Sequence, residues 1–306
     1  TVVNVNAGHG YEDQGLPLIN DFVSSNFIGG NGGGATNSQG AVTAFGGDGV
    51  NIIRGDLTFA NDLNPSTISI SSGTFTGGSG GTASLYLTID TPIYEQTFLN
   101  IPGAHGGHGF RFTRLDQSTP SFYYGAITDD TITVSGGTFI GGSGGTVINS
   151  EDGLISAQGG SGLFVDYADV VINGGTFSGG AAGTSNGILD RVGAGLHAQD
   201  ANLIINGGVF NTNGLGLRVE NRYYDTVNTI NNGLFGEIEY ISNYDDYTPT
   251  IDPTFDGSSR TTRANIYDGS VSNITLSGVT YNDINIFGGS VDTINFSSSA
   301  SGSDRV

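Results

Sequence analysis

The chain has 306 residues, of which 36% are hydrophobic and 10% aromatic, enough for a hydrophobic core. Its 29 acidic residues outnumber nine basic ones, all Arg, and the resulting net charge of −20 argues against binding to nucleic acid or anionic membranes. No apolar run approaches the ~20 residues that span a bilayer. The 53 glycines lack a Gly-X-Y period and alternate with β-branched runs, which predicts turns between strands.

Residues 1–40 differ from the rest and are expected to form an N-terminal cap or a free strand. The segment PLINDFVSSNF (17–27) predicts a short capping helix, because Pro17 suits a first helical turn and Leu18 and Phe22 recur at helical spacing. The alternative is that TVVNVN forms a free strand. The opening TVVNVNAG resembles the start of a chain processed for secretion, since no basic and apolar leader precedes it.

One phrase recurs through residues 41–296, as TISISSGTFTGGSGGT (67–82), TITVSGGTFIGGSGGT (131–146) and DVVINGGTFSGGAAGT (169–184). Its first residues alternate apolar and polar, which is typical of a strand with one buried face. A polar residue and a Gly then turn the chain before an aromatic residue re-enters the interior. The aromatic residues are Phe75, Phe139, Phe177, Phe210 and Phe235; four positions earlier stand Ser71, Ser135, Asn173, Asn206 and Asn231.

A second phrase keeps step with the first, as GLFVD (162–166), GLHAQ (195–199) and GLRVE (216–220). Together the phrases predict coils of about 20 residues with loops of variable length inserted at one corner. Stacked coils place Phe over Phe and Asn over Asn, so the amides of Asn173, Asn206 and Asn231 form a ladder. We therefore expect one all-β domain, with coils over 41–296 and a tail over 297–306.

This pattern resembles the right-handed parallel β-helix of the pectate-lyase-like superfamily, over residues 40–296. The resemblance implies a right-handed solenoid, and many members are polysaccharide lyases or hydrolases. The residues that could serve such chemistry are Asp129 and Asp130 in ITDDTIT and the outward-facing His197, with Asp200 and Asp190 nearby. However, the His segment GAHGGHGF precedes the Asp pair, and the family's Arg-Ile-Lys and Trp-containing segments are missing. The alternative is that the two Asp cap backbone groups and that His197 is solvated.

Calcium is the cofactor that the acidic composition suggests. GGDGVNIIR (46–54) approaches a calcium-binding nonapeptide through Asp48 and Asn51, although such motifs work in stacked copies and this one is single. His105 and His108 in HGGH supply either two metal ligands or a flexible loop. The insertion YISNYDDYTPTIDPTFD (240–256) offers Tyr244, Asp245, Asp246 and Tyr247 for carbohydrate or calcium, or packs on its own aromatics.

These features favour a secreted or cell-surface structural protein over an enzyme, because no complete catalytic group can be assembled. We expect an acidic rod that stacks end to end with itself as a filament, surface layer or adhesin or matrix subunit, since no helix is predicted to cap the C-terminal coil. Polysaccharide is a further candidate partner. The alternative functions are a carbohydrate-active enzyme, either lyase or hydrolase, and a glycan-binding module.

Overall fold

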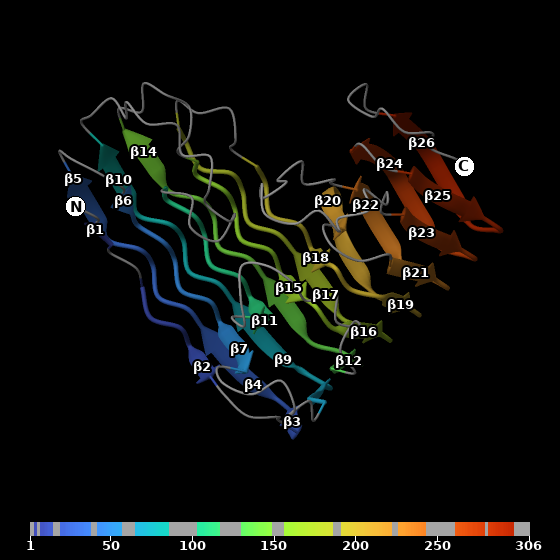
Figure 1. Ribbon diagram of the computed structural model, residues 1–306, viewed down its shortest axis with the longest axis horizontal. Helices are drawn as coiled ribbons and strands as arrows, with labels where there is room; N and C mark the ends of the chain where they lie inside the picture. The colour runs from blue at the N-terminus through green and yellow to red at the C-terminus, as the bar shows by residue number, and fades with distance from the viewer. Residues whose placement is uncertain are drawn as a thin grey trace, which may run out of the picture.

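The computed structural model describes residues 3–4, 7–14, 19–37, 42–56, 65–85, 103–116, 130–148, 156–185, 191–221, 226–242, 261–278 and 281–296. These residues form strands β1–β26 and no helix. Every pairing between the described strands is parallel, and each strand pairs with its counterpart in the neighbouring repeat of the sequence (Figure 1). The fold is therefore all-β with parallel sheets, an arrangement compatible with a parallel β-solenoid.

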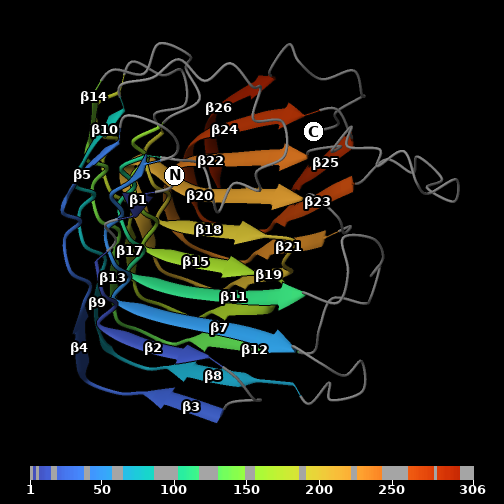
Figure 2. The same ribbon diagram turned by 60° about the vertical axis from the view of Figure 1, so that its left-hand side comes forward.

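An eight-stranded sheet is made by the first half of the repeated phrase. Its strands, in spatial order, are β25 (Tyr281–Ile286), β23 (Thr261–Ile266), β21 (Thr226–Ile230), β19 (Leu203–Ile205), β16 (Asp169–Ile172), β12 (Thr131–Val134), β8 (Thr67–Ile70) and β3 (Ile19–Phe22). In β12 and β16 the alternate residues are buried, as the period-two pattern predicts. This sheet forms one wall of the core (Figure 2).

A thirteen-stranded sheet forms the other wall and begins as two separate rows. The first row is β4 (Ser25–Ile28), β9 (Gly73–Thr76), β13 (Thr138–Ile140) and β17 (Thr176–Ser178), and the second is β2 (Tyr11–Gln14), β7 (Val50–Asp56), β11 (Phe110–Asp116), β15 (Leu163–Asp166) and β18 (Leu196–Gln199). The long strand β20 (Val209–Asn221) pairs with β17 at one end and β18 at the other, which joins the rows. β22 (Leu234–Ser242), β24 (Ser270–Gly278) and β26 (Ser290–Phe296) continue the joined sheet.

A glycine with positive φ turns the chain from the eight-stranded sheet into the first row. The φ angles lie between 81° and 156° in every such repeat, a region that favours residues without a Cβ. These glycines are Gly73, Gly137, Gly175, Gly208, Gly233, Gly269 and Gly289. The turn sends the following aromatic residue into the core, so that Phe75, Phe139, Phe177 and Phe210 are fully buried.

Like residues lie over like residues along the stack. The rings of consecutive phenylalanines from Phe75 to Phe235 are nearly parallel, with centroids 4.9, 4.8, 4.7 and 4.5 Å apart. Outside the turn, Asn206 Nδ2 donates to Asn173 Oδ1 at 2.8 Å, and Asn231 Nδ2 donates to Asn206 Oδ1 at 2.7 Å. Each repeat thus presents to its neighbour a surface that matches its own.

The first four repeats contain an arm that leaves the core between the two rows of the large sheet. The outgoing segments are 28–33, 76–81, 140–145 and 178–183, and the return segments are 7–10, 43–49, 103–109, 156–162 and 191–195. Beyond the outgoing segments lie β5 (Gly34–Asn37), β10 (Thr82–Leu85) and β14 (Thr146–Ile148), and β1 (Val3–Asn4) pairs with β6 (Val42–Thr43) nearby. In Figure 1 the arm occupies the left-hand side.

Backbone hydrogen bonds connect the outgoing and return segments directly. Gly78 N donates to Gly47 O, Gly107 N to Gly78 O and Gly142 N to Gly107 O, each at 2.8 Å, so the bonds alternate between the two kinds of segment. Packed sheets with side chains between them lie about 10 Å apart, whereas these backbones touch. A Cβ on Gly142 would lie 2.0 Å from Gly78 O. The Gly-Gly pairs therefore serve close packing, and the expectation that glycines mark turns holds for only part of them.

Three expectations for chain organisation are wrong. Residues 19–22 and 25–28 are strands rather than a capping helix, because they pair with β8 and β9 and bring Phe22 against Phe75 and Phe110. β1 is not a free strand, since it pairs with β6. Insertions also occur at two places rather than one corner, because the arm precedes the second row while other insertions follow it, as between β7 and β8.

Candidate functional site on the histidine face

All four histidines of the chain lie in return segments or in the strand that follows one. Inward residues of these strands, such as Val50, Phe110 and Phe112, belong to the core. Their neighbours therefore point outward, and the register aligns them from repeat to repeat. We call this outer surface the histidine face and define it by His9, Asp48, Asn51, His105, His108, Arg111, Phe164, His197, Arg218, Glu220 and Glu239.

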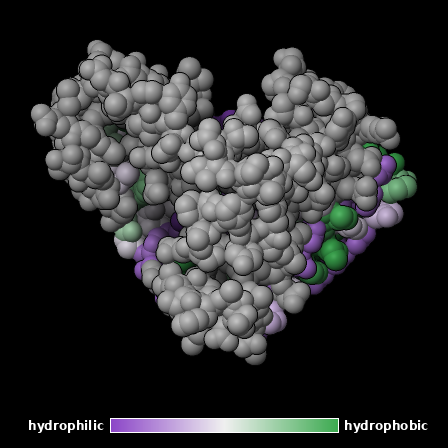
Figure 3. Space-filling model, viewed as in Figure 1, coloured by the Kyte–Doolittle hydropathy of each residue, from purple (hydrophilic) through white to green (hydrophobic). Residues whose placement is uncertain are grey.

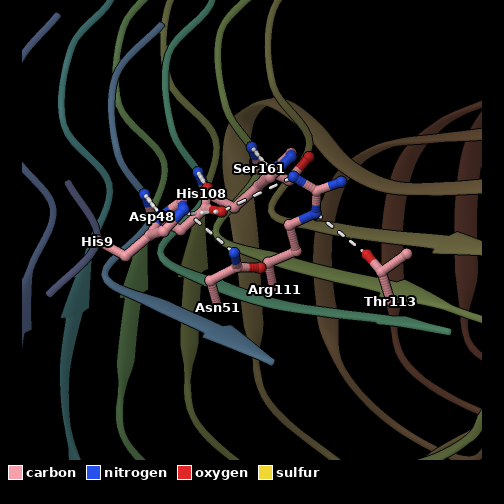
Figure 4. A network of polar contacts seen from close by, with 7 residues as sticks. All are labelled: His9, Asp48, Asn51, His108, Arg111, Thr113 and Ser161. Carbon is pink, nitrogen blue, oxygen red and sulfur yellow. Dashed lines mark hydrogen bonds and ion pairs between the residues drawn. The ribbon is translucent and has the colours of Figure 1, made fainter. Parts of the chain in front are cut away.

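A chain of hydrogen bonds crosses the histidine face from repeat to repeat (Figure 4). Asp48 N donates to His9 Nδ1 at 2.9 Å, His108 N donates to Asp48 Oδ1 at 2.6 Å, and Ser161 N donates to His108 Nδ1 at 2.9 Å. At each step a side chain accepts the backbone N–H of the equivalent residue in the next repeat. Gln158 N likewise donates to His105 Nδ1 at 3.2 Å.

These bonds fix the tautomers of three imidazoles. A neutral imidazole has one donor and one acceptor nitrogen, and Nδ1 of His9, His105 and His108 is the acceptor. The proton therefore resides on Nε2. For His9 this Nε2–H faces the side-chain amide of Asn51, whose nitrogen lies 3.1 Å away. The Asn51 NH2 group and the His9 Nε2–H are both donors and cannot bond to each other. If the Asn51 amide is flipped, its Oδ1, which otherwise has no hydrogen-bond partner, accepts from Nε2–H.

Asp48 is the buried acid of the site. Burial raises the pKa of its carboxyl above the ordinary value, while Arg111, the hydrogen bond from His108 N and His9 act in the opposite direction. Asp48 Oδ2 lies 3.5 Å from His9 Nδ1 and 3.9 Å from Arg111 Nη1. This carboxylate thus lies beside one donor, His108 N, and one cation, Arg111, while Glu12 acts with burial to raise its pKa.

His108 is held in its neutral form. Burial lowers the pKa of its imidazole well below the ordinary value, and the charge of Arg111 lowers it further. The His108 ring stacks on Phe164 with the centroids 4.8 Å apart, and the Arg111 guanidinium lies 5.7 Å from the centroid of the Phe164 ring. Arg111 Nε also donates to Thr113 Oγ1 at 3.1 Å.

Ion pairs occupy the part of the face nearest β20. His197 Nε2 lies 3.3 Å from Glu220 Oε2, and Arg218 Nε donates to Glu239 Oε2 at 2.6 Å. The side chains of His197 and Glu220 are 14% and 8% exposed, so the expectation of a solvated His197 is wrong. Asp200 instead lies fully buried at the corner after β18, and Asp190 is outside the described residues.

The other candidate residues lie elsewhere or outside the described residues. Asp130 is buried just before β12 and its Oδ1 accepts the Ser66 N–H at 2.6 Å, so it caps backbone on a different sheet from His197. Asp129, Tyr244, Asp245, Asp246 and Tyr247 fall outside the described residues. Tyr240, which the sequence places in the same insertion, lies in β22 and is fully buried in the core.

The HGGH segment is packed between repeats and is not a loop. Among the residues that the structure describes, no three His, Asp or Glu side chains gather as a metal site would require. In the same residues no helix has the length and apolar character to cross a membrane. What the histidine face provides is a row of side-chain acceptors for backbone N–H groups, a buried carboxylate beside Arg111, and the His197–Glu220 and Arg218–Glu239 pairs.

Sequence reasoning missed Arg111, Phe164, Arg218, Glu220 and Glu239. The signal for two of these residues, Phe164 and Arg218, is the alignment of the second phrase, which places them at the same outward position as His197. Glu220 stands two residues after Arg218 and faces the same side. Comparison with known families, with curated proteins and with solved structures finds no match to this chain.

Proposed function

We propose that the chain is a right-handed parallel β-helix with a structural role outside the cell, and that it assembles end to end with further copies of itself. The observation that carries this proposal is the state of the core at its two ends. Core residues are buried through the middle of the stack, whereas Tyr11 and Phe27 at one end and Val291 and Ile294 at the other are only partly buried.

The two ends match in register. Tyr11 and Ile294 belong to one inward column, which runs through Val50, Phe110 and Leu163. Phe27 and Val291 belong to the phenylalanine column. A second copy placed on β26 and β25 with its β2, β4 and β3 would continue both columns and both sheets in the same parallel sense.

Such a joint would use main-chain hydrogen bonds as well as apolar burial. Among the described strands, β26 pairs only with β24 and β25 only with β23, so each has one edge without a described partner. Parallel strand addition to an edge is a common mode of association. Because the two surfaces of the joint differ, the contact is heterologous and grows into a filament unless it closes.

The test is sedimentation velocity of the full chain over a concentration series. We expect wild type to form species larger than a dimer, and Tyr11→Asp and Ile294→Asp each to block growth, because each places a charge in one surface of the joint. An equimolar mixture of the two variants should form dimers, since one intact surface of each kind remains. Val227→Asp, at a side chain 45% exposed on β21, is the control that should assemble like wild type.

A wild-type chain that sediments as a monomer at every concentration would overturn the proposal. Equal loss of assembly in Val227→Asp would show that net charge rather than the ends is responsible. Circular dichroism of each variant checks that the fold is retained.

A carbohydrate-active enzyme is the second candidate, supported by the acid–base pair of His197 and Glu220 beside Arg218. Incubation with acidic polysaccharides, followed by assay for new reducing ends and unsaturated products, tests it. Product formation by wild type that His197→Gln abolishes would place this candidate first, and absence of product would remove it.

A further inference from the structure

Return segments 103–109 and 156–162 are joined by hydrogen bonds of two kinds. Ala104 N, Gly106 N and Gly109 N donate to the carbonyls of Ser156, Gln158 and Ser161, at 3.1, 2.9 and 3.0 Å. The amides of Gln158 and Ser161 point back toward 103–109, where imidazoles rather than carbonyls accept them. Two of the hydrogen bonds that link these segments therefore depend on histidine lone pairs.

Each lone pair that accepts a backbone N–H is also the site at which the imidazole would be protonated. Since Nε2 already carries the proton in His105 and His108, an added proton must bind Nδ1. The imidazolium Nδ1–H would then face a second donor, and a buried donor left without an acceptor is costly. Protonation and the hydrogen bond thus exclude each other.

The groups around His108 favour its neutral state. Arg111 and His197 face His108 from β11 and β18, and His105 precedes it on the same segment. Phe164 covers one face of the His108 ring, and Phe45 covers His105 with the centroids 4.7 Å apart. The nearby carboxylate is Asp48, whose Oδ1 is engaged by His108 N and whose Oδ2 lies toward His9 and Arg111.

We propose that His105 and His108 form an acid-sensitive latch: at neutral pH they hold segment 156–162 against segment 103–109, and in mildly acidic medium they release it. The latch is separate from the end-to-end contact.

Equivalent positions in the structure indicate which substitution should keep the hydrogen bond without titrating. Asp48 Oδ1 accepts His108 N–H at the position equivalent to the histidines, and Asn31 Oδ1 accepts Ser79 N–H at 2.9 Å in the outgoing segments. An amide oxygen can therefore take the place of Nδ1 without titrating. His105→Asn and His108→Asn, singly and together, are the test variants.

The experiment is amide hydrogen exchange of the full chain between pH 7 and pH 5, with protection factors calculated from the intrinsic rate at each pH. We expect protection of Gln158 and Ser161 in wild type to fall as the pH falls, by up to about 25-fold for each histidine, because the unprotonated fraction of a free imidazole of pKa about 6.5 falls by that factor over this range. Protection of Phe177 in the core should not follow. The double Asn variant should keep its protection.

Protection of Gln158 and Ser161 that is the same at pH 7 and pH 5 in wild type would overturn the latch. So would an equal loss in the double Asn variant. If that variant does not fold, imidazole 15N spectra of wild type still decide the matter, because the latch requires the Nε2–H tautomer of His105 and His108 at pH 7 and its loss together with the amide protection.

Discussion

Residue 107 has to be a glycine because the backbone carbonyl oxygen of Gly47 lies against its Cα. A Cβ there would stand 2.1 Å from Gly47 O, far inside contact distance, and the obstacle is backbone that cannot rotate away. The same relation recurs along the outgoing and return segments. At the residue scale the arm is thus specified by the absence of side chains rather than by their kind.

Gly107→Ala is expected to lower the free energy of unfolding by about 3 kcal/mol or more, because overpacking against fixed backbone forces the segments apart. The matched control is Gly34→Ala, where a Cβ meets nothing within 4 Å. The control should stay within about 0.5 kcal/mol of wild type. Urea denaturation of both variants checks the difference, and equal stability of the two would refute close packing in the arm.

Asp48 makes the free energy of unfolding depend on pH. Its pKa is raised by burial, so the folded state binds the proton more tightly than the unfolded state. The stabilisation that comes with this proton is complete below about pH 3.8 and is lost as the pH rises through the folded-state pKa. At neutral pH the buried carboxylate therefore carries a cost, which the bond from His108 N and the charge of Arg111 offset in part.

Asp48→Asn is expected to raise the melting temperature at pH 7, because it keeps an oxygen acceptor for His108 N and removes the buried charge. Asp48→Ala should lower the free energy of unfolding by about 1–3 kcal/mol, since His108 N then loses its acceptor. Thermal unfolding of both variants at pH 5 and pH 7 distinguishes removal of the buried charge from loss of the acceptor for His108 N. A lower melting temperature for Asp48→Asn at pH 7 would mean that the ion pairs outweigh the cost of burial.

At the scale of the element, each strand is stabilised by equivalent strands above and below it. Phe177 lies between Phe139 and Phe210, with ring centroids 4.8 and 4.7 Å away, and is fully buried. Stacked rings add about 0.5–1.5 kcal/mol per pair beyond the burial of their area. The turn glycine before each Phe and the Asn ladder outside it hold the rings in register.

Phe177→Ala should cost about 3–5 kcal/mol, because it removes a buried ring and opens a cavity inside the column. Ile204→Ala, at a side chain 44% exposed on β19, is the control and should change stability by less than about 1 kcal/mol. Equilibrium denaturation measures both. Similar losses of stability in the two variants would mean that a phenylalanine of the column contributes no more to stability than an exposed side chain does.

The sequence allowed prediction of elements where side chains alternate, and only there. The strands β8, β12, β16 and β19 follow from period-two spacing, and the turn glycines follow from their fixed distance to the Phe. The arm could not be predicted, because packing without side chains leaves no hydropathy pattern. The helix predicted for residues 17–27 is wrong, because the two short strands β3 and β4, joined by a turn at Ser24, imitate helical spacing.

The candidate site was predictable only in part for the same reason. The outward position of His197 follows from its phrase, but its partner Glu220 stands in the next repeat and is identified only once the register is known. The role of His105 and His108 depends on amides 53 residues further along the chain. Contacts of this kind are set by stacking rather than by local sequence.

At the scale of the whole molecule, the net charge of −20 opposes association of like copies. Some apolar side chains, such as Ile204 on β19 and Val227 on β21, are exposed. At the right of Figure 3, hydrophobic residues lie among hydrophilic ones on the side of the molecule. Such scattered apolar residues are common on protein surfaces. The ends of the core, rather than its sides, are therefore where we expect copies to meet.

Assembly should strengthen as salt is added, because screening at about 0.15 M ionic strength shortens the reach of surface charge to ~8 Å. Light scattering at fixed protein concentration from ~10 mM to ~500 mM NaCl measures this. Millimolar calcium at matched ionic strength distinguishes screening from cation bridging. Assembly that weakens as salt rises would mean that attraction between charges, rather than the apolar ends, joins the copies.

Negative-stain electron microscopy of the purified chain, in millimolar calcium and then in chelator, is the most direct test of end-to-end assembly. We expect filaments of constant width, one molecule across, with length that grows with protein concentration. Their loss in chelator would assign calcium a bridging role, and their persistence would leave the core ends as the joint. Single short particles under both conditions and at every concentration would contradict end-to-end assembly.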